Sequence, residues 1–142
     1  MQPIPDKNRA GKENQGKPSI KCFGRLWITK GSTHFLGRNR IALLEKIDEK
    51  GSINTAAKAM NISYKRAWEI VNTIKKVSGQ EVLECKSGGR GGGGSALTEH
   101  GKKLVRLYRY LEQKQHMLTE GMSAEAEAAL TDPDWTIEPK TE

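Results

Sequence analysis

The sequence has few of the residues from which metal, redox and catalytic sites are built. It contains two cysteines and three histidines among 142 residues. Cys22 and Cys85 lie far apart and form no CxxC pair, and with the histidines they give no metal-ligand spacing. No histidine has an obvious acidic or nucleophilic partner in the sequence. We therefore expect reduced, packed thiols, no metal or other cofactor, and a protein that is not an enzyme.

Long apolar runs are also absent. No stretch approaches the roughly 20 apolar residues that a membrane-spanning helix needs, and the start of the chain lacks the apolar segment of a secretory signal. Residues 1–19 are rich in Pro, Gly, Asn, Gln and Lys instead, which predicts a flexible arm. Together these absences predict a cytoplasmic protein.

Acidic residues are scarce in the middle of the chain. Residues 20–122 carry 19 Lys and Arg against nine Asp and Glu, whereas the last twenty residues carry one Lys and six acidic residues. A basic section of this kind fits a polyanionic partner, because Lys and Arg release counterions when they neutralise phosphates. The charge alone fits a soluble basic protein without such a partner equally well.

The first ordered elements predicted are a strand and a helix. Residues 20–29 mix β-forming side chains with Arg and Lys, which indicates an imperfect edge strand. Over residues 38–50 apolar residues recur at every third position, which is typical of a helix with one buried side. Gly51 is the expected end of this helix.

Two further helices are predicted directly afterwards. Residues 52–62 indicate a short helix, capped by Ser52 or Asn54, with alanines that allow a neighbouring helix to approach closely. Asn61 tolerates the left-handed conformation of a tight turn, and Ser63 caps a longer third helix. A short helix, a tight turn and a longer helix are typical of a helix-turn-helix.

A glycine-rich hairpin is predicted next. Residues 82–86 and 95–97 indicate strands, joined by the run SGGRGGGG at 87–94. This run is neither a P-loop, because no Lys-Ser/Thr pair follows it, nor a dinucleotide fingerprint, because it leads into a strand. A hairpin directly after a helix-turn-helix is a wing. The predicted fold is therefore mainly α with a small β component (α+β), a winged helix-turn-helix over residues 20–97.

A long last helix is predicted over residues 98–122, followed by an acidic tail over 123–142. Its apolar residues recur at alternating spacings of three and four. The stripe is longer than one small domain must bury, which favours a helix-helix seam in a homodimer. The alternative is that the stripe only closes the domain's own core. The predicted seam residues are Leu104, Tyr108, Leu111, Leu118 and Met122.

The start of the third helix holds the strongest candidates for binding a ligand. Its outward side chains are Tyr64, Lys65, Arg66 and Glu69, and a helix start favours a phosphate. Arg and Lys can bond guanine and Tyr can contact a thymine methyl, whereas a merely solvated helix start is the alternative. Trp68, beside them, is interpreted as a packed structural residue. The predicted DNA-contacting residues are Ser63, Tyr64, Lys65, Arg66 and Glu69, with Arg90 in the wing and Arg38 and Arg40 at the start of the first helix.

These segments resemble a known family. The stretch GSINTAAKAMNISYKRAWEIVNTIKK, followed by GGRGGGGSALTEHGKKLVRLY, is similar to the N-terminal DNA-binding domain of the molybdate-responsive (ModE-type) transcriptional regulators, relatives of the LysR-type helix-turn-helix. The resemblance covers about residues 22–118. Its most specific pieces are ISYKRAW at 62–68, the glycine-rich wing and LTEHG at 97–101. It implies a dimer paired through long helices, with residues 63–66 reading an operator and Arg90 in the wing.

One departure from the family leaves the function open. Family members continue into a separate molybdate-binding region, for which this chain has no segment, so molybdate sensing is not carried over. A stand-alone version and a truncated one both fit, and control of molybdenum-related genes rests on analogy alone. Three functions remain: a sequence-specific regulator that binds an inverted repeat in double-stranded DNA, a non-specific architectural DNA-binding protein, and an interaction module that pairs with another regulator. The varied, polar start of the third helix favours the first.

Overall fold

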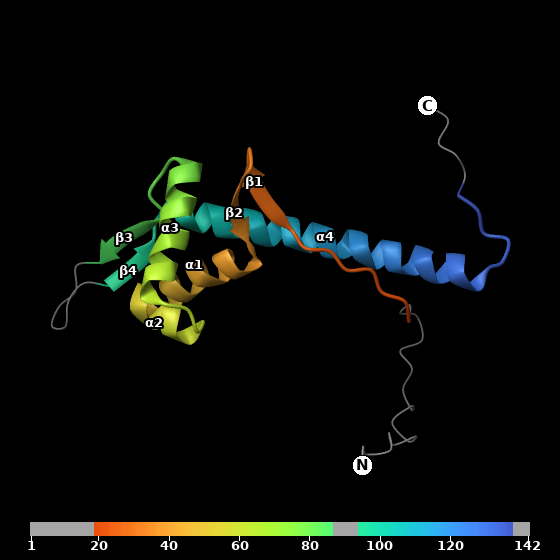
Figure 1. Ribbon diagram of the computed structural model, residues 1–142, viewed down its shortest axis with the longest axis horizontal. Helices are drawn as coiled ribbons and strands as arrows, with labels where there is room; N and C mark the ends of the chain where they lie inside the picture. Colours follow the sequence, from red (N-terminus) through yellow and green to blue (C-terminus); the bar gives the residue numbers. More distant parts are fainter. Residues whose placement is uncertain (1–18, 87–93, 138–142) are drawn as a thin grey trace, which may run out of the picture. The chain divides into compact units, whose positions relative to one another are not determined.

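The computed structural model describes residues 19–86 and 94–137. They fall into two compact units: one spans Gly24–Gln115, and the other combines the residues before this span with those after it. The last helix passes from the first unit into the second. In chain order, the elements (Figure 1) are β1 (Trp27–Lys30), β2 (Thr33–Gly37), α1 (Arg38–Lys50), α2 (Ile53–Ala59), α3 (Tyr64–Ser78), β3 (Leu83–Lys86), β4 (Gly94–Leu97) and α4 (Glu99–Thr131).

The core of the larger unit is built around α1. Ile41, Leu44 and Ile47 are completely buried, so the predicted helix and its buried stripe are confirmed. Gly51 ends α1 in the left-handed conformation, at φ 71°, and its N–H donates to the Ile47 carbonyl. Glycine adopts this conformation at no steric cost, and for that reason the helix stops there.

The helix-turn-helix is formed by α2 and α3. Ser52 caps α2, because its Oγ accepts a hydrogen bond from the Thr55 N–H at 3.3 Å. Asn61 lies in the left-handed region at φ 56°, as predicted for the tight turn. Ser63 then caps α3, with its Oγ accepting from the Arg66 N–H at 3.0 Å. The local side-chain chemistry therefore fixes both helix starts.

The structure contains two antiparallel hairpins. In the wing, β3 pairs with β4 from Leu83 opposite Leu97 to Lys86 opposite Gly94. The remaining residues of the predicted turn, 87–93, lie outside the described residues. The pairing confirms the wing strands and, with the three helices, the winged helix-turn-helix class.

The other hairpin corrects a prediction. Instead of one edge strand over 20–29, β1 starts at Trp27 and pairs with a second strand, β2, that reaches Gly37. The Trp27 ring lies against Gly37, where a β-carbon would clash with it. The missing side chain of Gly37 is a tertiary requirement that the strand pattern did not reveal.

The two cysteines differ in their surroundings. Both are free thiols, as expected, but only Cys22 is partly buried. Cys85 is exposed on β3, so the prediction that both are packed is wrong for this residue.

Helix α4 begins as predicted and continues further than predicted. The Thr98 Oγ1 accepts a hydrogen bond from the Gly101 N–H at 3.1 Å and caps the helix. Its end at Thr131 lies beyond Met122, because no proline interrupts the chain between Thr98 and Pro133. Among the described helices, none is long and apolar enough to span a membrane.

In the smaller unit, the residues before β1 run along the later part of α4. Cys22 donates its N–H to the Ser123 Oγ at 2.8 Å, and this hydroxyl in turn donates to the Thr119 carbonyl at 2.6 Å. Further along, the Glu127 carboxylate accepts from the Ile20 N–H at 2.7 Å. These bonds explain why Ser123 is buried although it is polar.

Candidate nucleic-acid interface

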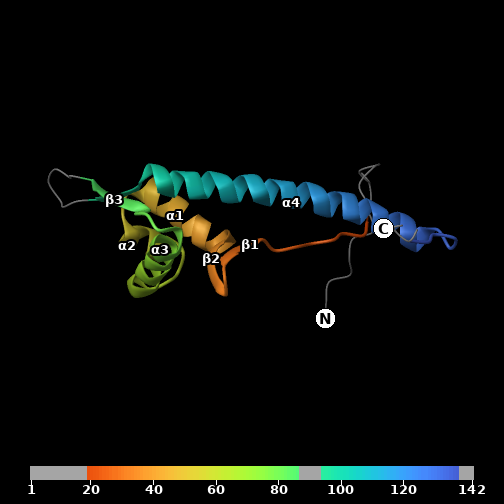
Figure 2. The ribbon, with the colours of Figure 1, turned by 90° about the horizontal axis from the view of Figure 1, so that it is seen from above.

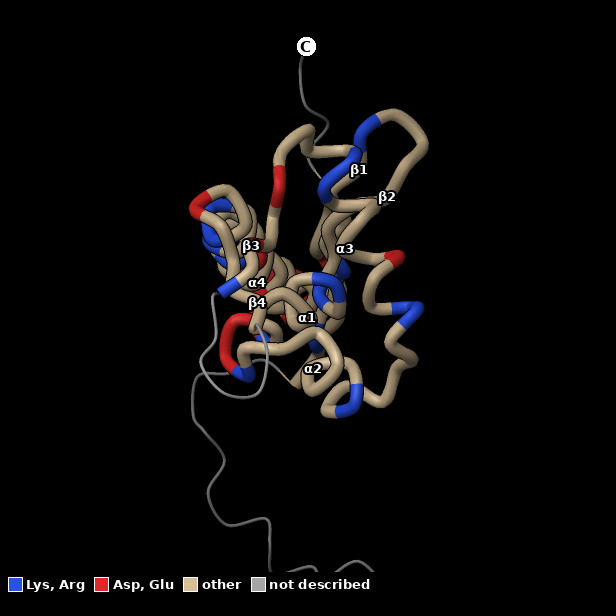
Figure 3. The backbone as a smooth tube through the Cα atoms, turned by 90° about the vertical axis from the view of Figure 1, so that its left-hand side faces the viewer, with Lys and Arg blue, Asp and Glu red and all other residues tan. Residues whose placement is uncertain are grey.

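Helix α3 presents one apolar side and one free side. Ala67, Ile70, Val71 and Ile74 are buried against the core. Within the larger unit, α3 and the β1–β2 hairpin lie on the side of α1 away from α4 (Figure 2). Basic residues occur on this same side, in α2, α3 and the hairpin (Figure 3). The predicted candidates Tyr64, Lys65, Arg66 and Glu69 are all exposed on the free side of α3.

The start of α3 suits an anionic ligand. Its first turn carries no acidic residue, so nothing offsets the partial positive charge of the helix start. The Ser63 Oγ uses a lone pair to accept from the Arg66 N–H, which leaves its O–H free to donate. Backbone N–H groups, a hydroxyl and the neighbouring Lys65 are the donors that a phosphate oxygen prefers.

Arg40 of α1 is a partly buried cation whose pKa responds to Arg66 of α3. The pKa of Arg40 is lowered, first by partial burial and then by the positive charge of Arg66. Arg40 is held in place because its Nη1 donates to the His34 carbonyl at 2.6 Å. Among the described residues, Arg40 has no acidic partner, and Arg66 has only the 3.4 Å contact with Glu69. Both cations therefore keep charge that an anionic ligand could neutralise.

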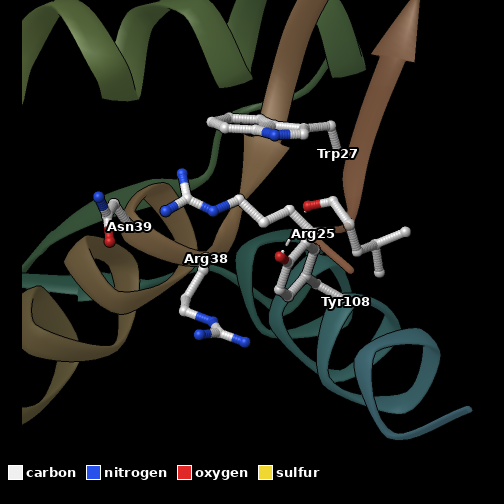
Figure 4. Close-up of a pocket in the computed structure, with 6 residues that line it drawn as sticks. Arg25, Trp27, Arg38, Asn39 and Tyr108 are labelled. Atoms are coloured by element: carbon white, nitrogen blue, oxygen red, sulfur yellow. Dashed lines mark hydrogen bonds between the residues drawn. The ribbon is translucent and has the colours of Figure 1, made fainter. Parts of the chain in front are cut away.

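Arg38 differs from Arg40. Its Nε lies 3.0 Å from the Glu112 Oε1 of α4, so its charge already has a partner within the chain. Arg38 also lines a cavity of about 220 Å³. Figure 4 shows its guanidinium directed away from Trp27 and Asn39, whereas the Arg25 side chain extends toward Asn39. The structure therefore separates two arginines that the sequence grouped together.

Trp68 belongs to the exposed surface of α3, although the sequence did not predict it there. It is 39% exposed, so the prediction that it is packed is wrong. Its ring meets that of Tyr64 edge to face, with 6.2 Å between the ring centroids. Helical spacing could have revealed this exposure, because Trp68 does not fall on the buried stripe of α3.

The predicted seam residues of α4 divide into two groups. Leu104 and Tyr108 are buried in the domain's own core, which was the alternative interpretation, and the Tyr108 hydroxyl donates to the Leu26 carbonyl at 2.9 Å. Leu111 is partly buried. By contrast, Leu118 and Met122 are exposed. The sequence did not single out further large exposed apolar residues on α4, namely Leu107, Tyr110, Met117 and Leu130.

The tip of the wing is the part of the predicted interface that remains undescribed. Arg90 lies outside the described residues, together with the glycines on either side of it. Its contact with DNA stays a prediction.

Comparison with known proteins finds relatives over part of the chain. No protein-family model matches the chain. The chain is 43% identical over 81 residues to the transcriptional regulator ModE of Haemophilus influenzae, a match that covers 57% of this chain and 32% of that protein. The DNA-binding transcriptional dual regulator ModE of Escherichia coli K12 is also 43% identical, with 57% of this chain and 31% of that protein covered. The resemblance to the ModE-type regulators is thereby confirmed.

The extent of these matches is limited. The chain spans about a third of the length of the curated relatives it matches. Among solved structures, ArgP from Mycobacterium tuberculosis matches with a TM-score of 0.45 and 18% identity, over 60% of this chain and 30% of that one.

Proposed function

We propose that this protein is a sequence-specific DNA-binding transcriptional regulator that acts as a dimer. The observation that carries the proposal is the exposed start of α3, where the Ser63 cap, Lys65 and Arg66 offer hydrogen-bond donors and the first turn carries no acidic residue. The names of the ModE relatives support regulation of transcription.

In the proposed complex, the start of α3 enters the major groove. Arg66 and Lys65 donate hydrogen bonds to base edges, where guanine offers two acceptors to one arginine. Arg40 and the Ser63 hydroxyl contact the backbone phosphates on either side and fix the position of the helix. Glu69, which is exposed one turn beyond Lys65, is proposed to accept a hydrogen bond from a cytosine amino group. Arg90 of the wing is proposed to contact an adjacent phosphate or the minor groove.

The proposed dimer pairs through exposed residues of α4. Leu118 and Met122 are one helical turn apart on the same face, and both are about half exposed or more. A soluble chain rarely leaves several large apolar side chains on one helix uncovered, so an identical helix is the simplest cover. A two-fold dimer of this kind binds an inverted repeat, with half-sites about 34 Å apart.

Selection from a random duplex library tests the proposal. We expect an enriched inverted repeat that is bound roughly 10³-fold or more tightly than scrambled duplexes at the same salt concentration. Salt-sensitive binding without any enriched motif would instead indicate a non-specific architectural protein. A chain that binds DNA only in complex with a different regulator would indicate an interaction module. Enriched sites near molybdenum-related genes would extend the family analogy to the targets.

A further inference from the structure

Two aromatic side chains stand exposed at the start of α3. Tyr64 is 51% exposed and Trp68 is 39% exposed, although both are large enough to dominate a core. Their rings are 6.2 Å apart at an interplanar angle of 85°, the edge-to-face arrangement that aromatic pairs prefer. The two rings thus contact each other and form one aromatic surface on α3.

The Tyr64–Trp68 pair lies on a different edge of α3 from Arg66. Tyr64 and Trp68 are one helical turn apart and share a side, whereas Arg66 lies about 200° around the helix axis from Tyr64. The proposed reading surface therefore has a cationic edge, at Arg66, and an aromatic edge, at Tyr64 and Trp68. The exposed Lys65 and Glu69 lie between these edges.

An aromatic edge needs an apolar partner. Hydrogen bonds and charges account for the cationic edge, but neither of them compensates for the apolar area of two half-exposed rings. In the major groove, the apolar group on the base edges is the C5-methyl of thymine. Because the rings already contact each other, ordering them against a methyl costs less side-chain freedom than ordering two separate rings.

We propose that the Tyr64–Trp68 pair reads thymine through its methyl group, and that Trp68 is a specificity-determining residue. This inference rests on the proposed function, since it assigns a base preference to one edge of the same helix. It commits the aromatic pair to DNA rather than to a protein partner, because Tyr64 is the first residue of α3 and directly follows the Ser63 cap. The operator therefore carries a thymine at a fixed position in each half-site.

Replacing thymine by uracil provides a test that needs no variant protein. The operator enriched by the unmodified chain is synthesised with deoxyuridine at one thymine position at a time, which removes the methyl and keeps every hydrogen-bonding group. We expect one position in each half-site at which uracil weakens binding about fourfold or more, the equivalent of roughly 0.8 kcal/mol for one buried methyl. Uracil at thymines outside the operator is the control and leaves the affinity unchanged.

Variants then assign the effect to Trp68. Trp68→Ala weakens binding to the thymine operator by a similar factor. The variant then binds the uracil operator and the thymine operator with equal affinity, because it no longer contacts the methyl group. Trp68→Phe keeps an aromatic ring and part of the preference for thymine, and thermal unfolding of each variant shows that the fold is retained. An operator that is selected strongly but binds equally with uracil at every position overturns the inference and leaves the proposed function standing. If no operator is enriched, the proposed function fails first.

Discussion

The Arg109 guanidinium of α4 meets the Glu45 carboxylate of α1 as a fork. Its Nε lies 2.9 Å from Oε1, and its Nη2 lies 2.6 Å from Oε2. The third nitrogen donates to Glu112 at 2.8 Å, and Glu112 also accepts from Arg38 at 3.0 Å. These bonds raise the pKa of Arg109 and lower that of Glu112. The network joins the first part of α4 to α1, next to the helix-turn-helix.

We expect Arg109→Lys to lower the free energy of unfolding by about 1 kcal/mol. Lysine keeps the charge but presents one nitrogen and cannot form the fork, and the side chains are exposed enough for solvent to weaken the pair. Chemical denaturation measures the change. Lys102→Arg is the control, because Lys102 makes only an exposed contact with Glu99 on the same helix. An unchanged Arg109→Lys variant would show that the fork contributes nothing measurable.

Acid is expected to weaken the contribution of Glu112. The pKa of this carboxyl lies below its ordinary value of 4.5, chiefly because Arg109 donates a hydrogen bond to it. The charged form therefore stabilises the fold above pH 4.5, and this stabilisation is lost as the pH falls through the lower pKa of the folded state. Denaturation between pH 6 and pH 3 should show Glu112→Gln less stable than the parent at pH 6, with the difference shrinking toward pH 3. A constant difference would contradict this account.

Two glycines of α4 are expected to respond to alanine in opposite ways. A β-carbon on Gly101 would clash with the Val82 carbonyl oxygen, whereas one on Gly121 would meet open space. Gly101→Ala should therefore lower the free energy of unfolding by about 1–3 kcal/mol. Gly121→Ala, the matched control, should raise it by up to about 1 kcal/mol, because alanine is the better helix former. Thermal unfolding at one protein concentration compares the two, and equal effects would contradict the close approach of Gly101 to Val82.

Arg66→Ala is expected to weaken operator binding by about 1–3 kcal/mol and to relax specificity at one base position. The reason is that a bidentate bond to guanine discriminates between bases, whereas a contact with phosphate does not. Titration of the operator and of single-base variants measures both effects. Arg40→Ala is the comparison, since a proposed phosphate contact should weaken binding to all sequences alike. Unchanged operator affinity in Arg66→Ala would remove Arg66 from the interface.

Leu118→Lys is expected to convert the proposed dimer to a monomer. Charges placed opposite one another in an apolar seam must be desolvated and repel each other. Sedimentation measures the oligomeric state, and circular dichroism confirms that the helices remain. Leu130→Lys is the control, because Leu130 is 73% exposed and lies about 120° around the helix from Leu118. A Leu118→Lys variant that stays dimeric would place the seam elsewhere.

Local chemistry determined much of the fold and the candidate interface. Ser52 and Ser63 cap their helices, and Gly51 and Asn61 adopt left-handed conformations where the sequence placed a stop and a turn. Each of these features depends on the backbone conformation of neighbouring residues, which side-chain type controls directly. The exposed side of α3 followed in the same way, since four buried positions at helical spacing leave only one side free.

Tertiary structure decided which partner each surface meets. Periodicity showed that α4 has an apolar stripe, but only packing showed that Leu104 and Tyr108 enter the domain's own core while Leu118 stays exposed. It likewise placed Arg38 against Glu112, whereas Arg40, two residues further along the chain, donates to the His34 carbonyl instead. The physical reason is distance along the chain. A helical pattern fixes which side chains share a face, whereas the residue opposite that face comes from a remote segment that local preferences do not encode.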